Sequence, residues 1–130
     1  MISAGFDIGT KFIKVCIVEN NDILGDAIIR IESSIDQVFK EAYKEALERA
    51  GIKRRKIKGI ATTGYCADLV KKASYAVSEP FCIARAVYHL NINVRTIVDV
   101  GNLFINIVAI DRNGFVVESI TNDKCASGSG

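Results

Sequence analysis

Several features are scarce in this sequence of 130 residues, and some of these scarcities exclude a class of protein. The chain contains one proline, no tryptophan and one histidine. The single histidine excludes a catalytic centre built on several histidines. No apolar run approaches the roughly 20 residues that a membrane-spanning helix requires. Charge of one sign is also scarce, because 17 basic and 15 acidic residues leave a formal net charge of only +2. We therefore expect neither a nucleic acid nor a membrane as partner.

The composition that remains is typical of a globular domain. Hydrophobic residues make up 49% of the chain and charged residues 25%, and the length is that of one ordinary domain. The N-terminal stretch has no basic segment and reaches a charge at Asp7, so we expect no signal peptide and a cytoplasmic protein. The cysteines form no C-x-x-C pair, which in a reducing compartment favours thiols or metal ligands over disulfides. They are Cys16, Cys66, Cys82 and Cys125.

The first fifty residues predict three strands followed by a helix. Apolar runs separated by the turn residues 20–22 are typical of an antiparallel meander, and Cys16 is expected to be a core thiol within it. In the following residues the spacing of apolar side chains becomes that of an amphipathic helix. Ser34 and Gln37 form a capping box at its start, and Gly51 is a typical residue at its end. We expect the strands at 2–8, 11–18 and 23–31 and the helix at 35–50.

The remaining residues predict shorter elements. Residues 53–58 form a basic cluster, which fits a solvated loop after a helix better than a nucleic-acid patch. The stretch Asp111-Arg112-Asn113-Gly114 is typical of a hairpin turn. We expect strands at 59–63, 75–78, 95–100, 103–110 and 115–120, and helices at 66–73 and, after Pro80, at 81–91.

The chain starts the same unit twice. When residue i is aligned with residue i + 92 without gaps, Asp7-Ile8-Gly9 meets Asp99-Val100-Gly101 and the apolar positions that follow coincide. A shared Asp-x-Gly at the same register indicates duplication more strongly than shared apolar alternation does. We therefore expect a first unit of the order βββαβαβα at residues 1–92 and the opening strands of a second, truncated unit at 93–130.

Each Asp-x-Gly hairpin contains groups that phosphate binding requires. The N–H groups of a tight turn attract anions, glycine lets the backbone approach, and a lysine adds positive charge. A carboxylate at the end of the strand can hold Mg²⁺ through water. One such segment alone is better explained as a plain hairpin turn, but two copies facing each other could clamp one nucleotide. The candidate residues are Asp7, Gly9, Thr10, Lys11 and Lys14 in the first copy and Asp99, Gly101 and Asn102 in the second.

Two such hairpins at the head of a duplicated, ribonuclease-H-like unit resemble the α/β superfold of actin, hexokinase and the heat-shock chaperone ATPases. Residues 61–65, 95–101 and 122–130 more narrowly resemble the BadF/BadG/BcrA/BcrD family, and the last stretch is the most specific. Members of that family are ATP-dependent activators of 2-hydroxyacyl-CoA dehydratases and ATPase subunits of benzoyl-CoA reductase. The resemblance covers essentially the whole chain. It implies that the intact protein uses ATP to deliver a low-potential electron to an enzyme acting on an acyl-CoA.

The resemblance also implies roles for the candidate residues. Asp7 and Asp99 would position Mg²⁺ or water, the other six would hold the phosphates of ATP, and Cys125 would ligate a [4Fe-4S] cluster. In the family the cluster is shared at a dimer interface, with two cysteines from each subunit. The second of these cysteines lies downstream of this motif, beyond residue 130. The resemblance thus implies a homodimer, or a heterodimer with a related ATPase subunit, and an acyl-CoA dehydratase or reductase component as partner.

The second loop departs from the activators' pattern. Where the activators have Gly-Gln-Asp, this chain has Asn102-Leu103-Phe104, so the glutamine and the second acid are missing. This departure favours a second hypothesis, a non-catalytic regulatory or assembly subunit of the same superfold. A third hypothesis is a small-molecule kinase of that superfold, which would contain no iron. We also expect the 130-residue piece alone to be inactive.

Overall fold

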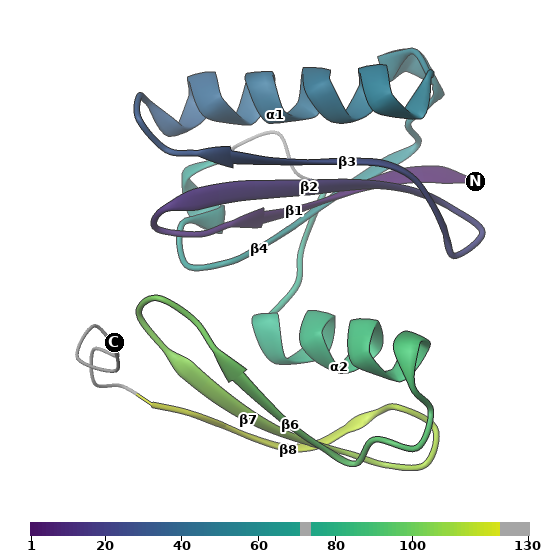
Figure 1. The fold of residues 1–130 in the computed structure, drawn as a ribbon, viewed down its shortest axis with the longest axis vertical. Helices are drawn as coiled ribbons and strands as arrows, with labels where there is room; N and C mark the ends of the chain where they lie inside the picture. Colours follow the sequence, from purple (N-terminus) through teal and green to yellow (C-terminus); the bar gives the residue numbers. More distant parts are fainter. Residues whose placement is uncertain (71–73, 123–130) are drawn as a thin grey trace. The chain divides into compact units, whose positions relative to one another are not determined.

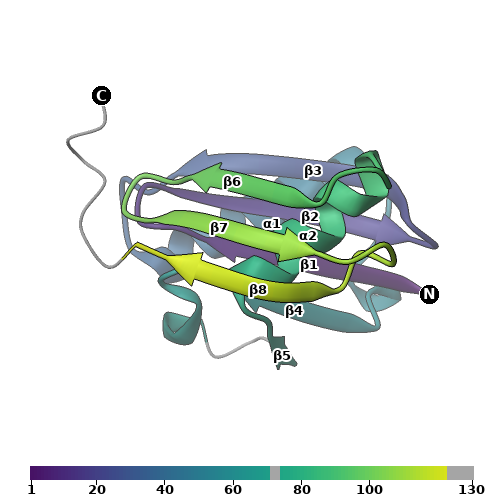
Figure 2. The ribbon, with the colours of Figure 1, turned by 90° about the horizontal axis from the view of Figure 1, so that it is seen from below.

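The computed structural model describes residues 1–70 and 74–122, which belong to two compact units. The first unit, Met1–Val77, is a five-stranded sheet with a long helix covering one face (Figure 1). The second, Ser78–Gly130, contains a three-stranded sheet with one helix packed on it. Figure 2 shows the three strands of this second sheet side by side. The architecture is mixed α/β, as the sequence predicted.

The first unit begins with the predicted antiparallel meander. Strands β1 (Ile2–Ile8), β2 (Phe12–Glu19) and β3 (Asp22–Arg30) pair in chain order. The turn between β2 and β3 places Asn20 and Asn21 at positive φ values of 51° and 75°. Asparagine tolerates this region better than most residues do, which explains why so short a turn forms at this point.

Helix α1 (Ile35–Ala50) has the ends that the sequence predicted. Ser34 Oγ accepts a hydrogen bond from the amide of Gln37 at 3.4 Å. Gly51 ends the helix in the left-handed conformation, which glycine adopts without steric cost. Between these ends the apolar face of the helix packs mainly against β3 and β2. The helix therefore fixes the position of the sheet that carries the first hairpin.

The core of the first unit lies between α1 and the sheet. The ring of Phe6 on β1 stacks on Phe39 with centroids 4.3 Å apart, and it meets the edge of Tyr43 at 5.3 Å. Both geometries are favourable for aromatic pairs, and they hold β1 against the helix. The core also includes Ile8, Ile13, Val15, Ile17, Val38, Ala42 and Ala46.

Two parallel strands complete the first sheet, whose order is β3-β2-β1-β4-β5. β4 (Gly59–Thr63) lies beside β1, and β5 (Tyr75–Ala76) lies beside β4. β5 is shorter than the predicted strand at 75–78, because the ladder with β4 contains only two residue pairs. Because β4 pairs with β1, the end of β4 lies beside the end of β1, where the first loop begins. The paired residues are more than fifty positions apart in the chain.

The helices that follow β4 differ from their predicted bounds. A single 3₁₀ turn, η2 (Ala67–Leu69), lies where a helix was predicted at 66–73, and the last residues of that range lie outside the described part. Helix α2 (Glu79–Leu90) starts two residues earlier than predicted. Ser78 takes the N-cap position, and Pro80 fits the first turn, where no amide donor is needed. No helix in the described residues is long and apolar enough to cross a membrane.

The second unit contains the three remaining predicted strands. β6 (Thr96–Val100), β7 (Ile105–Ile110) and β8 (Val116–Thr121) form an antiparallel sheet in chain order. The predicted turn between β7 and β8 is present, since Asp111 Oδ1 accepts hydrogen bonds from two amides of the turn at 2.8 and 2.9 Å. The small core between α2 and this sheet consists of Ala84, Ile97, Val108 and Ile110.

The two units contain the same hairpin, in the register that the 92-residue offset predicts. Asp7 pairs with Lys14 across β1 and β2, and Asp99 pairs with Asn106 across β6 and β7. In each hairpin the loop glycine donates its amide to the carbonyl three residues later, at 3.0 Å in the first and 2.9 Å in the second. The same Asp-x-Gly pattern therefore gives the same backbone hydrogen bond in both loops.

The compact units divide after Val77, earlier than the repeat boundary expected between residues 92 and 93. The difference is helix α2, which packs against β6, β7 and β8 and so belongs to the second compact unit. A repeat in sequence and a division by packing are separate properties of the chain. The division of the repeat into residues 1–92 and 93–130 therefore stays a prediction.

Candidate functional site

The first hairpin places an acid and a base opposite each other. Lys14 Nζ lies 2.9 Å from Asp7 Oδ2. The side chains are 55% and 34% exposed, so water screens the pair and it adds little to stability. Its importance is chemical, because an ammonium and a carboxylate lie together beside a narrow turn. The ammonium can bind an anionic oxygen, while the carboxylate can accept a hydrogen bond from water.

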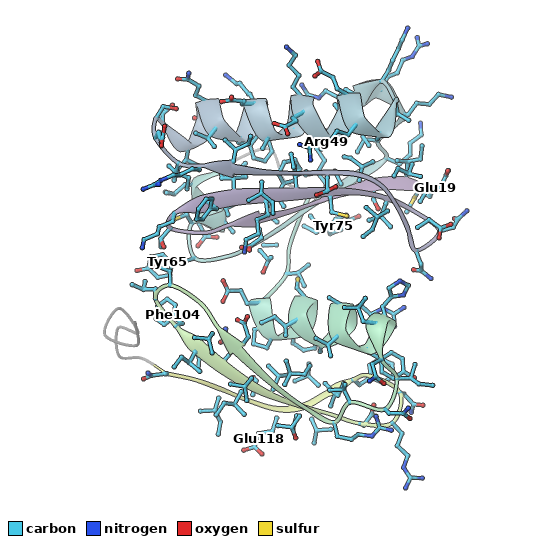
Figure 3. The ribbon with its side chains drawn as sticks, in the orientation of Figure 1. Glu19, Arg49, Tyr65, Tyr75, Phe104 and Glu118 are labelled. Atoms are coloured by element: carbon cyan, nitrogen blue, oxygen red, sulfur yellow. The ribbon has the colours of Figure 1, made fainter. Side chains whose placement is uncertain are left out.

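The glycine in each loop keeps the turn narrow. The amide of Gly9 donates to the carbonyl of Phe12, and the amide of Gly101 donates to that of Phe104. A Cβ on either glycine would lie 3.0 Å from the accepting oxygen, so a larger residue would widen the loop. Figure 3 shows Phe104 in the loop that joins β6 to β7. Both glycines shape the backbone that the sequence proposed as a phosphate cradle.

A third segment, which the sequence did not nominate as a site, lies against the first loop. Thr63, the last residue of β4, is paired with Asp7. Gly64 follows with φ at 97°, and a Cβ there would lie 2.6 Å from both Asp7 Oδ1 and the carbonyl oxygen of Ile8. The amide of Cys66 donates to that same carbonyl at 2.9 Å.

The hydroxyl of Thr63 is the unusual feature of this corner. It is buried, and it has no hydrogen-bond partner among the described residues. Buried polar groups are nearly always paired, so an orphaned hydroxyl beside Asp7 fits a site that receives a polar ligand. The sequence contained one clue, since Thr63 and Gly64 fall in a stretch that resembles the family, but no spacing rule connects them to Asp7.

The second hairpin holds its acid differently. Asp99 Oδ2 accepts a hydrogen bond from Asn106 Nδ2 at 3.2 Å, and Asn106 is only 2% exposed. Asn106 Oδ1 accepts from the hydroxyl of Thr121 at 2.7 Å, and its Nδ2 lies 3.5 Å from Glu79 Oε2. Where the first unit pairs its aspartate with a lysine, the second pairs it with a neutral, buried amide.

The candidate residues thus fall into two groups. Asp7, Gly9, Thr10, Lys11 and Lys14 lie together on the first hairpin, and Asp99, Gly101 and Asn102 lie together on the second. Cys125 lies outside the described residues, so the predicted cluster loop has no structural description. In residues 1–70 and 74–122 no three His, Cys, Asp or Glu side chains come together as a metal site.

The three described cysteines are half-buried free thiols: Cys16, Cys66 and Cys82. The prediction that Cys16 is a core thiol is wrong. It lies between Val15 and Ile17 on β2, and since both of these face the core, the alternation of the strand turns Cys16 to the opposite face. There it pairs with Asp26 on β3. Burial, and secondarily the charge of Asp26, raises the pKa of the Cys16 thiol.

Replacement of this carboxylate, Asp26→Asn, is expected to speed alkylation of Cys16 by iodoacetamide at pH 8. The thiolate is the reactive form, and removal of a negative charge that raises the pKa increases its fraction at a given pH. Peptide mass spectrometry over time measures the rate, with Asp22→Asn on the same strand as the control. An unchanged rate in the Asp26 variant would show that its charge does not act on the thiol.

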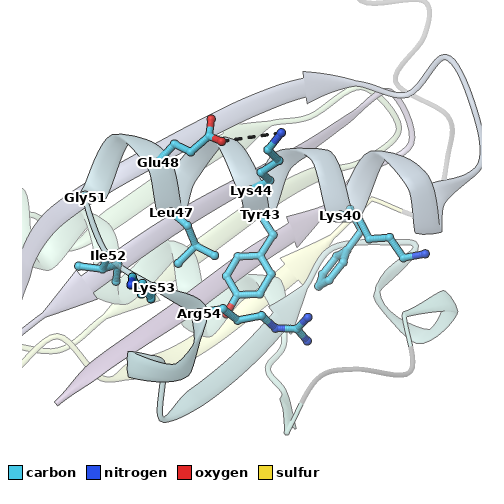
Figure 4. Close-up of a pocket in the computed structure, with 10 residues that line it drawn as sticks. Lys40, Tyr43, Lys44, Leu47, Glu48, Gly51, Ile52, Lys53 and Arg54 are labelled. Atoms are coloured by element: carbon cyan, nitrogen blue, oxygen red, sulfur yellow. Dashed lines mark ion pairs between the residues drawn. The ribbon is translucent and has the colours of Figure 1, made fainter.

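A pocket of about 380 Å³ lies along α1 from Phe39 onward and along the segment after the helix, as far as Arg54 (Figure 4). Tyr43 is nearly buried in its wall, and the guanidinium carbon of Arg54 lies 5.6 Å from the centre of the Tyr43 ring. Burial raises the pKa of Tyr43, and Arg54 partly opposes that effect. None of the lining residues belongs to either hairpin loop. The pocket is therefore separate from the candidate phosphate loops.

Solved structures with the same arrangement define the class of this fold. The activator of the 2-hydroxyisocaproyl-CoA dehydratase from Clostridium difficile, solved with bound ADPNP, matches with a TM-score of 0.86 and 30% identity over 97% of this chain and 47% of its own. An ROK hexokinase from Thermus thermophilus matches with a TM-score of 0.62 at 14% identity over 98% of this chain and 50% of its own, which shows the fold alone. The chain has the actin-like ATPase fold, as the sequence predicted.

The family follows from the sequence comparisons. The model of the BadF/BadG/BcrA/BcrD ATPase family matches residues 4–130, and the chain belongs to that family. A benzoyl-CoA reductase subunit from Thauera aromatica is 33% identical over 137 residues, which cover 99% of this chain and 47% of the relative. The chain spans about half the length of the curated relatives that it matches.

Proposed function

We propose that the intact protein binds Mg·ATP through its two hairpin loops and hydrolyses it to drive electron transfer to an enzyme that acts on an acyl-CoA. The repeated Asp-x-Gly hairpin carries this proposal, because each copy presents a carboxylate beside a narrow, glycine-closed turn. Membership of an ATPase family supports it, as does the ADPNP bound to a solved relative.

In this proposal each candidate residue has a chemical task. Lys14 and Lys11 attract phosphate oxygens, and the turns closed by Gly9 and Gly101 let the backbone approach them. Thr10 and Asn102 add polar groups from the same turns. Asp7 and Asp99 accept hydrogen bonds from water, either on the metal or aligned for attack on the terminal phosphate. Bound Mg²⁺ would supply charge neutralisation at the phosphates.

The electron-transfer part of the proposal depends on Cys125. Its thiolate would ligate a [4Fe-4S] cluster, and four thiolates are needed to hold one. The proposal therefore includes a second subunit, in a homodimer or in a heterodimer with a related ATPase subunit, and a reducing compartment such as the cytoplasm. The names of the relatives support an acyl-CoA dehydratase or a benzoyl-CoA reductase component as the electron acceptor.

One observation favours a second candidate function, a non-catalytic regulatory or assembly subunit. The second loop contains Asn102-Leu103-Phe104, in which no side chain can act as an acid or base in hydrolysis. Such a subunit would retain the hairpins for folding, and the intact protein would show neither heat nor a shift in melting temperature on titration with Mg·ATP. A kinase of the same superfold would phosphorylate a small molecule and carry no iron.

Anaerobic purification of the intact protein separates these functions. We expect a coloured preparation that contains iron and hydrolyses ATP. Loss of iron on Cys125→Ala, with ATP binding retained, would support the cluster assignment. A preparation that has neither iron nor ATP hydrolysis would contradict the proposal. An iron-free preparation that transfers phosphate from ATP would instead support a kinase.

A further inference from the structure

The two aspartates of the repeated hairpin have different environments, although the backbone around them is the same. Asp7 is paired with the ammonium of Lys14 at 2.9 Å. Within the described residues no cation pairs with Asp99, whose carboxylate accepts from the amide of Asn106 at 3.2 Å. Lys14 and Asn106 occupy equivalent positions, directly across the hairpin from each aspartate. The repeat has therefore kept the acid and exchanged its partner.

We infer that Asn106 is a positioning residue that orients the carboxylate of Asp99 without neutralising it. Its full negative charge is then left for the divalent cation that accompanies the nucleotide. The inference rests on the proposed binding of Mg·ATP and assigns the greater share of the cation's recognition to the second hairpin. An ion pair such as that of Asp7 and Lys14 leaves less net charge for a cation than a carboxylate held by a neutral donor.

The hydrogen bonds around Asn106 determine which way its amide faces. Its Oδ1 accepts from the Thr121 hydroxyl at 2.7 Å, so the amide nitrogen faces β6 and α2. There it donates to Asp99 and lies 3.5 Å from Glu79 Oε2. A flipped amide would place its oxygen against two carboxylates, which only accept, and would remove the donor from Asp99, which is costly at 2% exposure. The amide is thereby locked with its donors toward Asp99.

Burial makes this arrangement rigid. The side chain of Lys14 is long and more than half exposed, so it can move away from Asp7. The side chain of Asn106 is short and is enclosed between α2 and the sheet. A hydrogen-bond partner held in this way restricts the rotation of the carboxylate that it contacts. Loss of such a supporting partner typically costs about 10- to 100-fold in metal affinity or activity.

Two substitutions in the intact protein test the inference. Asn106→Leu replaces the amide with an apolar side chain and removes both donors, while Asn106→Lys introduces the partner found in the first hairpin. We expect each to weaken Mn²⁺ binding in the presence of ADP by about tenfold or more, measured from the EPR signal of free Mn²⁺. We also expect kcat for ATP to fall while KM changes little, because Lys14 and the turns still bind the phosphates.

Thr121→Val and Thr96→Val form a matched pair of milder changes. Both threonines are exposed on outer strands of the second sheet, but only the Thr121 hydroxyl bonds to Asn106. We expect weaker Mn²⁺ binding in Thr121→Val and wild-type binding in Thr96→Val. These variants keep the test available if the Asn106 variants do not fold.

The outcomes separate the inference from the proposed function. Wild-type protein that binds no Mg·ATP would overturn both. If wild-type protein binds Mg·ATP while the Asn106→Leu and Asn106→Lys variants keep its Mn²⁺ affinity and kcat, only the inference fails. A lower melting temperature with unchanged Mn²⁺ affinity would likewise overturn it, because the amide would then have a structural role alone.

Discussion

Gly25→Ala is expected to lower the free energy of unfolding by about 1–3 kcal/mol, the usual range for overpacking. A Cβ at this position on β3 would lie 2.6 Å from the amide nitrogen of Ala50 and 2.7 Å from the carbonyl oxygen of Ala46. Both atoms belong to the backbone of α1, so relief requires the last turn of the helix to move away from the sheet. Urea denaturation followed by circular dichroism measures the change.

Gly5→Ala is the matched control for this prediction. Gly5 also lies in the first sheet, but a Cβ there would meet nothing within 4 Å. We expect its stability to match or slightly exceed that of the wild type, because alanine reduces the freedom of the unfolded chain. Equal stabilities for Gly25→Ala and Gly5→Ala would contradict the close approach of β3 to α1.

Gly64→Ala is expected to reduce Mg·ATP affinity and hydrolysis by the intact protein at least about tenfold. Its φ of 97° disfavours any side chain, and the new Cβ would lie 2.6 Å from Asp7 Oδ1. The carboxylate must then turn away from the loop, and displacement of a reacting group by about 1 Å can cost 10²-fold in rate. Calorimetric titration and a phosphate-release assay measure the two effects.

Gly59→Ala, at the other end of β4, is the control for Gly64→Ala. A Cβ at Gly59 would meet nothing within 4 Å. This variant should bind and hydrolyse ATP as the wild type does. Full activity in Gly64→Ala would show that the contact between the end of β4 and Asp7 is not needed for the role proposed for the Asp7 carboxylate.

Features that depend on neighbouring residues could be predicted from the sequence. The capping residue Ser34 and the terminal Gly51 are local signals for the ends of α1, and the structure confirms both. The hairpins were also predictable, because alternating apolar residues and turn residues determine them locally. The register of the two Asp-x-Gly loops followed from an internal comparison of the chain with itself.

Features that depend on distant residues could not be predicted in this way. Thr63 and Gly64 reach the first loop only because β4 pairs in parallel with β1, and no local pattern specifies that register. The sequence around Asn106 is that of a strand with one exposed face, and it does not show on which face the asparagine lies. In the structure Asn106 is buried, because α2 covers it. The residues that support the two aspartates are therefore the part of the site that required the structure.

The central claim is that the two Asp-x-Gly hairpins together bind the phosphates of ATP. Calorimetric titration of the intact protein with Mg·ATP tests it most directly when wild type is compared with the double variant Asp7→Asn, Asp99→Asn. The account predicts saturable binding to the wild type and an affinity at least about tenfold lower in the double variant, which keeps the shape of both side chains. Absence of binding to the wild type, or equal affinity in the double variant, would contradict it.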